Sequence, residues 1–433
     1  MRGKNLKVLK NNINIEQLCN QLIWYLTVIL ITIMALFDGH DLVQVLMYGI
    51  TACVGFLILI KERTTFRPKI QSYHVIIMIF IGICYASSLW GWDTGYPIST
   101  SGYIIRIFIC MSVFYYHYEK QESVAPLIQA VKWGGYMLAY ICLIGYDLRN
   151  VVEILLKGGR LFNAFVCFIE GKSVPGLFYG IFTPNINFLG KYVAIAAVIG
   201  FLDMAYHRKN LFCELLYVLP AVVFIAISGG KMNFLMLFIG VFIILLLKTR
   251  RETTKKTLLS WGIILIVTIA VLYILSFIPM FEETFNRFRQ MIENLLGTRY
   301  EVSTNERVTM FKVGMEQFIK TPIGGIGVDN ARFLLEREAG IQTYLHCNYI
   351  ELLTGVGAIG TLAFYLCYGY PALQFLKYRK CVNEHTKTCI VLLIVSLIAD
   401  IASITYTLRI TYLLFGIYFI HAKKLKEQNN RLV

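Results

Sequence analysis

The chain has 433 residues, of which 57% are hydrophobic and only 15% are charged, with a formal net charge of +15 at pH 7. Soluble globular proteins carry about 25% charged residues, so the composition excludes an ordinary soluble domain. Apolar runs of about 18 or more residues, each long enough to cross the hydrocarbon core of a bilayer as a helix, recur along the chain. They predict an all-α, polytopic membrane protein.

The first twenty residues are polar and basic, and the first apolar run follows without a cleavage site of small residues. A secretory signal peptide ends in such a site. We therefore expect the first span to be a retained anchor.

About twelve apolar segments are predicted to span the membrane. They lie at about 21–37, 42–60, 73–90, 102–118, 126–146, 187–206, 211–228, 232–247, 258–278, 349–369, 388–406 and 408–421. With the N-terminus inside, basic clusters fall on six of the seven inner segments, as the positive-inside rule requires. Topology therefore explains the positive charge, and the expected partner is the lipid bilayer, with no nucleic acid.

This topology divides the chain into three parts. Residues 1–278 hold nine spans and an outer loop at 147–186. Residues 279–348 form a large extracytoplasmic loop, and residues 349–433 hold three spans and a basic cytoplasmic tail. Long loops with structure of their own are commonly functional, so we look for chemistry in residues 279–348.

The large outer loop is predicted to be helical. Its eight basic and nine acidic residues nearly balance, and three helical patterns follow one another at 281–296, 303–322 and 329–340. A capping box, Ser303-x-x-Glu306, opens the second pattern. The third begins with a capping Asp or Asn and closes at a glycine.

Arg307 lies in the first turn of the helix that Ser303 is predicted to cap. Backbone N–H groups without internal partners and an adjacent arginine make an anion site suited to phosphate. The alternative is a surface arginine paired with Glu306 or Glu301.

His346 lies just before the tenth predicted span, at the outer membrane surface. It is either an interfacial histidine without a role or a proton-transfer group beside an anion site. The seven histidines form no HxxxH or HExxH spacing, the chain has no DxD, and its eleven cysteines form no C-x-x-C pair. These absences predict no metal site, no cofactor and no disulfide framework.

Two further cations stand out. Lys231, in "ISGGKMNF", lies at the outer turn before a span and is either a ligand or simply solvated. Arg106 lies several residues inside a span, where an unpaired charge costs about 2.5 kcal/mol or more. We expect Arg106 to face the bundle interior, either paired with a residue such as Asp400 or binding a ligand.

The segment Gly355–Gly360 spells GxGxxG, the glycine pattern of dinucleotide-binding folds. Such a site requires a preceding strand, a following helix and an acidic residue about 20 positions further on. Here the pattern is followed by the uniformly apolar "TLAFYLCYGY". We interpret the glycines as packing residues that allow another helix to approach closely.

These motifs together resemble the O-antigen ligase and polymerase superfamily. "NERVTMFKVGMEQFIKTPIGGIGVDNARFL" resembles its R-x-x-x-(aromatic)…P-x-x-G-x-G pattern, and His346, Gly357 and Gly360 are in register with its H-[NS]-x9-G-x-x-G motif. "SGGK" lies where the family has S-x-S-R, and "TPNINFLGKY" resembles the family's N-P-N segment. Cys347 and Lys231 depart from the pattern, since the family has Asn or Ser and Arg there.

The resemblance extends from about Arg160 to Gly360 and implies a GT-C-like fold and a glycosyltransferase activity. Such proteins transfer a glycan from a polyprenyl-diphosphate donor, here expected to be undecaprenyl diphosphate, to a sugar hydroxyl at the outer face of the bacterial cytoplasmic membrane, without metal. Flippase and chain-length regulator proteins are the partners that it implies. The implied roles are catalytic for His346 and Arg307 and substrate-binding for Lys231, Arg160, Arg106 and Arg332.

Three activities remain open from the sequence. A polymerase joins lipid-linked repeat units into O-antigen, capsular or exopolysaccharide, and the imperfect ligase motif favours this activity. A ligase transfers a finished chain to another acceptor. A flippase also has about a dozen spans but is expected to place charges and broken helices near the membrane midplane.

Overall fold

The computed structural model describes most of the helical bundle and the second half of the large loop. The described ranges are 2–37, 41–62, 66–156, 186–206, 211–227, 230–249 and 302–432, with Asn286, Arg289, Gln290 and Glu293 besides. These residues form thirteen α-helices and two short 3-10 helices, and no strand occurs among them.

The helices follow the predicted spans closely. They are α1 (Arg2–Leu36), α2 (Asp41–Glu62), α3 (Ser72–Ala86), η2 (Ser87–Leu89), α4 (Gly95–Glu119), α5 (Ala125–Leu156), α7 (Ile186–Tyr206), α8 (Leu211–Ile227), α9 (Lys231–Thr249), α12 (Val302–Lys320), α13 (Ala331–Ala339), α14 (Asn348–Lys377), η4 (Arg379–Cys381), α15 (Glu384–Ala399) and α16 (Arg409–Leu432). Eleven of the twelve predicted spans coincide with a helix. The ninth, at 258–278, and the predicted loop helix at 281–296 lie outside the described ranges, apart from the four single residues.

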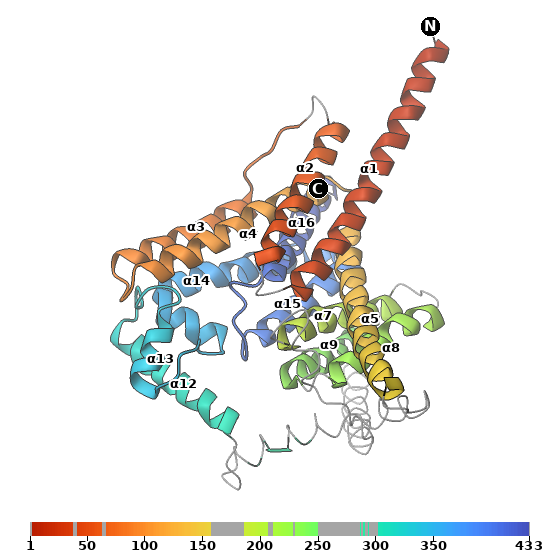
Figure 1. Ribbon diagram of the computed structural model, residues 1–433. Coiled ribbons are helices and arrows are strands. Elements are labelled where there is room, and N and C mark those ends of the chain that lie inside the picture. Colours follow the sequence, from red (N-terminus) through yellow and green to blue (C-terminus); the bar gives the residue numbers. More distant parts are fainter. Residues whose placement is uncertain are drawn as a thin grey trace.

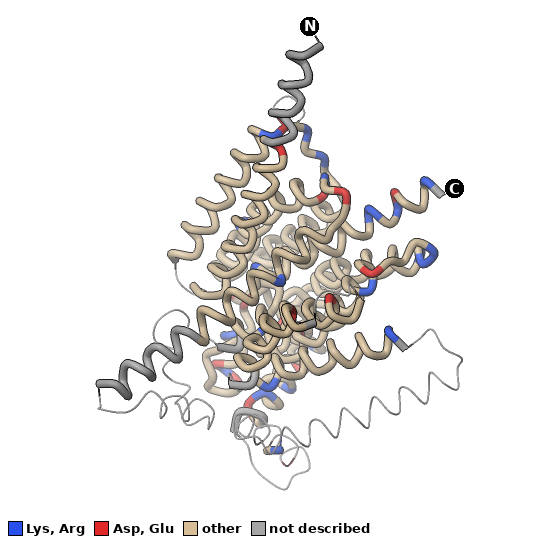
Figure 2. Tube along the Cα trace, turned by 90° about the vertical axis from the view of Figure 1, so that its right-hand side faces the viewer, with Lys and Arg blue, Asp and Glu red and all other residues tan. Residues whose placement is uncertain are grey.

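Seven helices among the described residues are long and apolar enough to cross a membrane. Figure 2 shows long tan stretches in the helices, with charged residues mainly at their ends, as expected where a charge in the bilayer interior is costly. The prediction of an all-α polytopic membrane protein is confirmed.

One predicted span was placed wrongly. The apolar segment 388–406 was expected to cross as one helix, but α15 ends at Ala399 and residues 400–408 form turns before α16 begins. Asp400 follows α15 directly and is completely buried. Most of residues 400–408 are buried in protein, and hydropathy alone does not distinguish such burial from burial in lipid.

The helices pack in two groups that meet along α15 and α16. On one side α3, α4, α14 and α16 pack together, and on the other α5, α7, α8 and α9 do (Figure 1). Small residues bring helices close: a Cβ on Gly134 of α5 would lie 2.7 Å from Ile31 of α1, and one on Gly135 would lie 2.3 Å from Ala196 of α7. Helices α12 and α13 pack at the start of α14 (Figure 1).

Candidate active site

His346 projects from the connection that leads into α14. Its φ angle is +55°, a left-handed conformation that is uncommon for a residue other than glycine and costs about 1–3 kcal/mol when it is held. The imidazole packs against the ring of Tyr344, with 4.2 Å between centroids. Backbone strain of this kind gathers at functional sites, so the conformation supports a role for His346.

The start of α14 is anchored by Asn348. Its backbone N–H donates to the carbonyl oxygen of Asp400 at 2.8 Å. Its side-chain oxygen accepts from the backbone N–H groups of Thr405 and Tyr406, at 2.9 and 3.1 Å. The turn between α15 and α16 therefore fixes the position of the helix end beside His346. In this chain the asparagine one residue later makes this attachment, whereas the family pattern has its Asn or Ser at Cys347.

Helix α12 lies directly against the first turns of α14. A Cβ on Gly314 would lie 2.5 Å from Ile350, and the Thr354 hydroxyl donates to the Gly314 carbonyl oxygen at 3.1 Å. The helix begins at Val302, one residue before the predicted Ser303 cap. Its second turn carries Arg307, whose side chain is exposed.

The loop 322–327, which carries the P-x-x-G-x-G pattern, packs into a break in α14. At the break, Gly357 adopts φ +65° and ψ −168°, and a Cβ there would lie 2.2 Å from the Ile323 carbonyl oxygen. The Gly327 N–H donates to the Gly355 carbonyl oxygen at 2.8 Å, and the Ala358 N–H donates to that of Pro322 at 2.8 Å. The GxGxxG glycines therefore serve backbone packing.

The glycines of the GxGxxG pattern were expected to allow another helix to approach closely. Among them only Gly360 does so. A Cβ on Gly360 would lie 3.2 Å from Ile83 of α3, which is a helix contact. At Gly357 the expectation was wrong, because loop backbone occupies that place. A positive φ cannot be read from spacing, although glycine is the residue that permits it.

The other face of the same loop is held by the connection between α3 and α4. The Trp92 N–H donates to the Ile326 carbonyl oxygen at 3.0 Å, and the Val328 N–H donates to the Ser87 hydroxyl at 3.1 Å. The Trp90 indole N–H donates to the Gly324 carbonyl oxygen at 3.0 Å. A segment about 240 residues earlier in the chain thus holds the loop against α14.

Arg332, predicted to bind substrate, forms an ion pair beside this loop. Its Nε donates to Oδ1 of Asp329 at 2.8 Å, and the Thr100 hydroxyl donates to Oδ2 of the same carboxylate at 3.1 Å. Burial opposes the charged form of Arg332, but the Asp329 carboxylate outweighs it and raises the pKa of the guanidinium. The pair is half exposed on the Arg332 side, so the guanidinium also faces solvent.

His346, Arg307 and Lys191 interact electrostatically at the end of the bundle where α14 begins. Burial, followed by the positive charges of Arg307 and Lys191, lowers the pKa of His346 to about 4. The imidazole is therefore neutral near pH 7, as a proton acceptor must be. Its pKa is well below the ordinary value of about 6.5.

Lys191 is the residue that sequence reasoning missed. It lies in the second turn of α7, its side chain is buried, and its amino group lies 4.8 Å from the centroid of the Phe188 ring. A lysine this close to the start of a predicted span resembles an interfacial anchor. A signal was present in "TPNINFLGKY", because that stretch already resembled a family motif.

The remaining predicted residues have different positions. Lys231 is the first residue of α9, which packs on α7 so tightly that a Cβ on Gly190 would lie 1.9 Å from the amide of Asn233. Lys231 thus lies at the outer end of the helix beside the one that carries Lys191. Arg160 lies outside the described residues.

Arg106 does not face the bundle interior as was expected. Its side chain is exposed on α4, and a Cβ on Gly102 would lie 3.9 Å from its Nη1, so the guanidinium extends back toward the start of the helix. A long side chain can place its charge at the membrane surface in this way. Asp400 instead accepts hydrogen bonds from Tyr365 and Thr405.

Comparison with known families gives a match in the part of the chain that holds most of these site residues. Residues 215–365 match the family model described as O-antigen ligase, a range that includes Lys231, Arg307, Arg332 and His346. No curated protein matches the chain. The resemblance to the O-antigen ligase and polymerase superfamily is thereby confirmed for residues 215–365.

Proposed function

We propose that the protein is a polymerase that joins undecaprenyl-diphosphate-linked oligosaccharide repeat units into O-antigen, capsular or exopolysaccharide. The reaction takes place at the outer face of the cytoplasmic membrane, is independent of metal and inverts the anomeric centre. The observation that carries the proposal is His346, held with a left-handed backbone just before α14, with the charges of Arg307 and Lys191 acting on its imidazole. A base beside fixed positive charge suits the transfer of a glycan from a diphosphate.

His346 takes the proton from the acceptor hydroxyl as the hydroxyl oxygen attacks the anomeric carbon. The bond from that carbon to the diphosphate oxygen breaks, and the electron pair leaves with undecaprenyl diphosphate. Arg307 and Lys191 stabilise the departing charge, and Lys231 contributes a further cation from the end of α9. Fixed charges aimed at developing negative charge usually supply the largest part of such catalysis.

The lowered pKa of His346 fits this sequence of events. In the free protein the two neighbouring cations lower the pKa to about 4. An anionic diphosphate between the cations opposes their effect and raises the basicity of the imidazole. The base therefore becomes stronger when the donor is bound, which links proton removal to the presence of a leaving group.

A ligase and a flippase are the two alternatives to a polymerase. A ligase requires the same donor site, and the description of the matching family favours it. It differs from a polymerase only in the acceptor. A lipid-linked oligosaccharide flippase is the lesser alternative, because the strained and anchored residues lie at the outer end of the bundle.

The experiment that tests the proposal uses the purified protein in liposomes with a lipid-linked oligosaccharide as donor. A ladder of glycans that grows by whole repeat units, in the presence of EDTA and without any second acceptor, is the expected result. Transfer of glycan only to an added non-homologous acceptor would assign the ligase activity instead. Movement of donor across the bilayer without new glycosidic bonds would show a flippase and contradict the proposal.

A further inference from the structure

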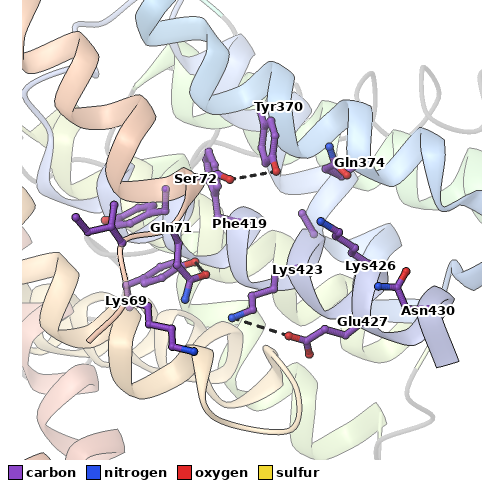
Figure 3. A pocket seen from close by; sticks show the side chains of 14 residues that line it. Lys69, Gln71, Ser72, Tyr370, Gln374, Phe419, Lys423, Lys426, Glu427 and Asn430 are labelled. Carbon is purple, nitrogen blue, oxygen red and sulfur yellow. Dashed lines mark hydrogen bonds and ion pairs between the residues drawn. The ribbon is translucent and has the colours of Figure 1, made fainter. Parts of the chain in front are cut away.

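A basic pocket lies at the opposite end of α14 from His346. It has a volume of about 390 Å³ and lies among the start of α3, the ends of α4 and α14, and α16 (Figure 3). Its polar lining includes Lys69, Ser72, Tyr370, Gln374, Lys423 and Lys426, together with one carboxylate, that of Glu427. The positive-inside pattern predicts that this end of the bundle faces the cytoplasm.

The cations of the basic pocket are not all neutralised by neighbouring carboxylates. Lys423 pairs with Glu119 and lies 3.9 Å from Glu427. Lys69 and Lys426 are exposed and form no ion pair with any residue that the structure describes. Figure 3 shows both around the same space as the Tyr370 hydroxyl. The pocket therefore offers two available positive charges to an anion.

Hydroxyl groups complete the polar lining. The Ser72 hydroxyl donates to the Tyr370 hydroxyl at 3.2 Å, and the Gln374 amide lies on the same wall of the pocket. Hydroxyl and amide donors beside lysines suit a phosphate group, whose oxygens accept several hydrogen bonds at once.

An apolar groove adjoins the basic pocket. It has a volume of about 380 Å³, shares Lys69, Gln71 and Tyr115 with the pocket, and runs between α2, α3 and α4. Its walls are mainly apolar and include Leu59 and Phe66, which are 50% and 41% exposed. A basic, hydroxylated hollow thus continues into an apolar one at the surface of a membrane protein.

We propose that the basic pocket and the apolar groove together bind one anionic phospholipid of the adjacent leaflet. The lipid phosphate lies between Lys69 and Lys426 and accepts hydrogen bonds from the pocket hydroxyls, and an acyl chain lies in the groove against Leu59 and Phe66. Basic pockets between transmembrane helices on the cytoplasmic side are suited to anionic head groups. The shared lining residues favour a lipid, because a soluble anion leaves the apolar groove without an occupant.

The bound lipid joins α3, α4, α14 and α16 at their inner ends. Because it binds the folded bundle, it raises thermal stability as its concentration rises. The test uses the delipidated full-length protein in a non-ionic detergent, with phosphatidylglycerol added and binding followed by native mass spectrometry and by thermal unfolding. We expect one tightly held phosphatidylglycerol, and about tenfold weaker binding in Lys69→Ala/Lys426→Ala.

A matched control removes the same charge from the same end of the bundle. Arg379→Ala/Lys380→Ala alters two exposed residues in η4, outside both hollows, and should leave affinity within about twofold of the parent protein. Equal losses in the two double variants would mean general attraction to positive charge and would overturn the site. Circular dichroism and gel filtration establish that each variant is folded before its affinity is compared.

Two further ligands identify the occupant. Phosphatidylcholine with the same acyl chains should bind more weakly than phosphatidylglycerol, and the pocket variant should affect it little. Inorganic phosphate alone should not stabilise the protein at millimolar concentration. If inorganic phosphate gave the same stabilisation, dependent on Lys69 and Lys426, the occupant would be a soluble anion and the lipid proposal would be wrong.

Discussion

The two ends of α14 present cationic sites that are built in different ways. At the outer end, His346 and Asp329 have left-handed backbone, α14 is broken at Gly357, and a loop is hydrogen-bonded into the break. At the inner end, most side chains of the basic pocket come from regular helices, and Lys69 and Gln71 come from the short segment before α3. A reaction site needs groups that are fixed in place before the substrate arrives. A site that binds a flexible lipid can be built from mobile lysine side chains.

Labelling of introduced cysteines tests the assignment of the two ends to opposite sides of the membrane. In a cysteine-free background, Glu338→Cys should react with a membrane-impermeant maleimide on intact cells, and Lys380→Cys should not, because the basic segments are retained inside. Both positions are exposed, so both should react after the cells are permeabilised. The opposite pattern would invert the topology and remove the outer-face reaction from the proposal.

The strained outer end should be far less tolerant of a methyl group than the regular part of the same helix. Gly357→Ala places a Cβ 2.2 Å from the Ile323 carbonyl oxygen at a φ that only glycine adopts readily, and we expect a loss of at least about 2–3 kcal/mol. Gly369→Ala is the matched control, since a Cβ there meets nothing within 4 Å. Thermal unfolding of the two purified variants measures the difference, and equal stabilities would argue against the loop packing described here.

Removal of either cation beside His346 should slow turnover while folding is retained. Arg307→Ala and Lys191→Ala should each lower polymer formation about 100-fold, the usual effect of losing one preorganised donor. Lys312→Ala removes an exposed cation from the same helix as Arg307 and should have little effect. If Lys191→Ala were as active as Lys312→Ala, the diphosphate would be bound elsewhere.

The pKa of His346 predicts a pH profile for kcat/KM. Because the pKa is lowered to about 4, the imidazole stays neutral well below pH 6, and activity should be nearly constant from pH 7.5 to about 5.5 and fall only in stronger acid. Arg307→Ala removes one cause of the lowered pKa, so its acid limb should shift toward higher pH. Half-maximal activity near pH 6.5 in the unaltered protein would indicate an unperturbed histidine that lies away from both cations.

Sequence patterns predicted the fold well where one physical effect was dominant. The length of the apolar runs predicted the helices, and the basic clusters predict a topology that cysteine labelling tests. Hydropathy failed at Asp400, where a turn buried in protein resembles a span. Periodicity also did not show which face of α4 carries Arg106, because lipid and protein are both apolar surroundings.

The site was only partly predictable for a related reason. The histidine motif and the glycine pattern identified His346 and the loop, and the family match agrees with them. The electrostatic effect of Lys191 on His346 depends on the packing of α15 against both α7 and α14, which lies beyond any local pattern. The pKa shift follows from that packing and from burial, which no local sequence pattern indicates.

The central claim is that His346 is the base and not only part of the donor site. The most direct test measures donor binding and polymer formation side by side in purified His346→Gln, which keeps a polar side chain but cannot accept a proton at neutral pH. We expect binding of the lipid-linked donor within a few-fold of the parent protein and polymer formation lower by at least about 100-fold. Polymer formed at the parent rate would contradict the account and leave His346 with a positioning role alone.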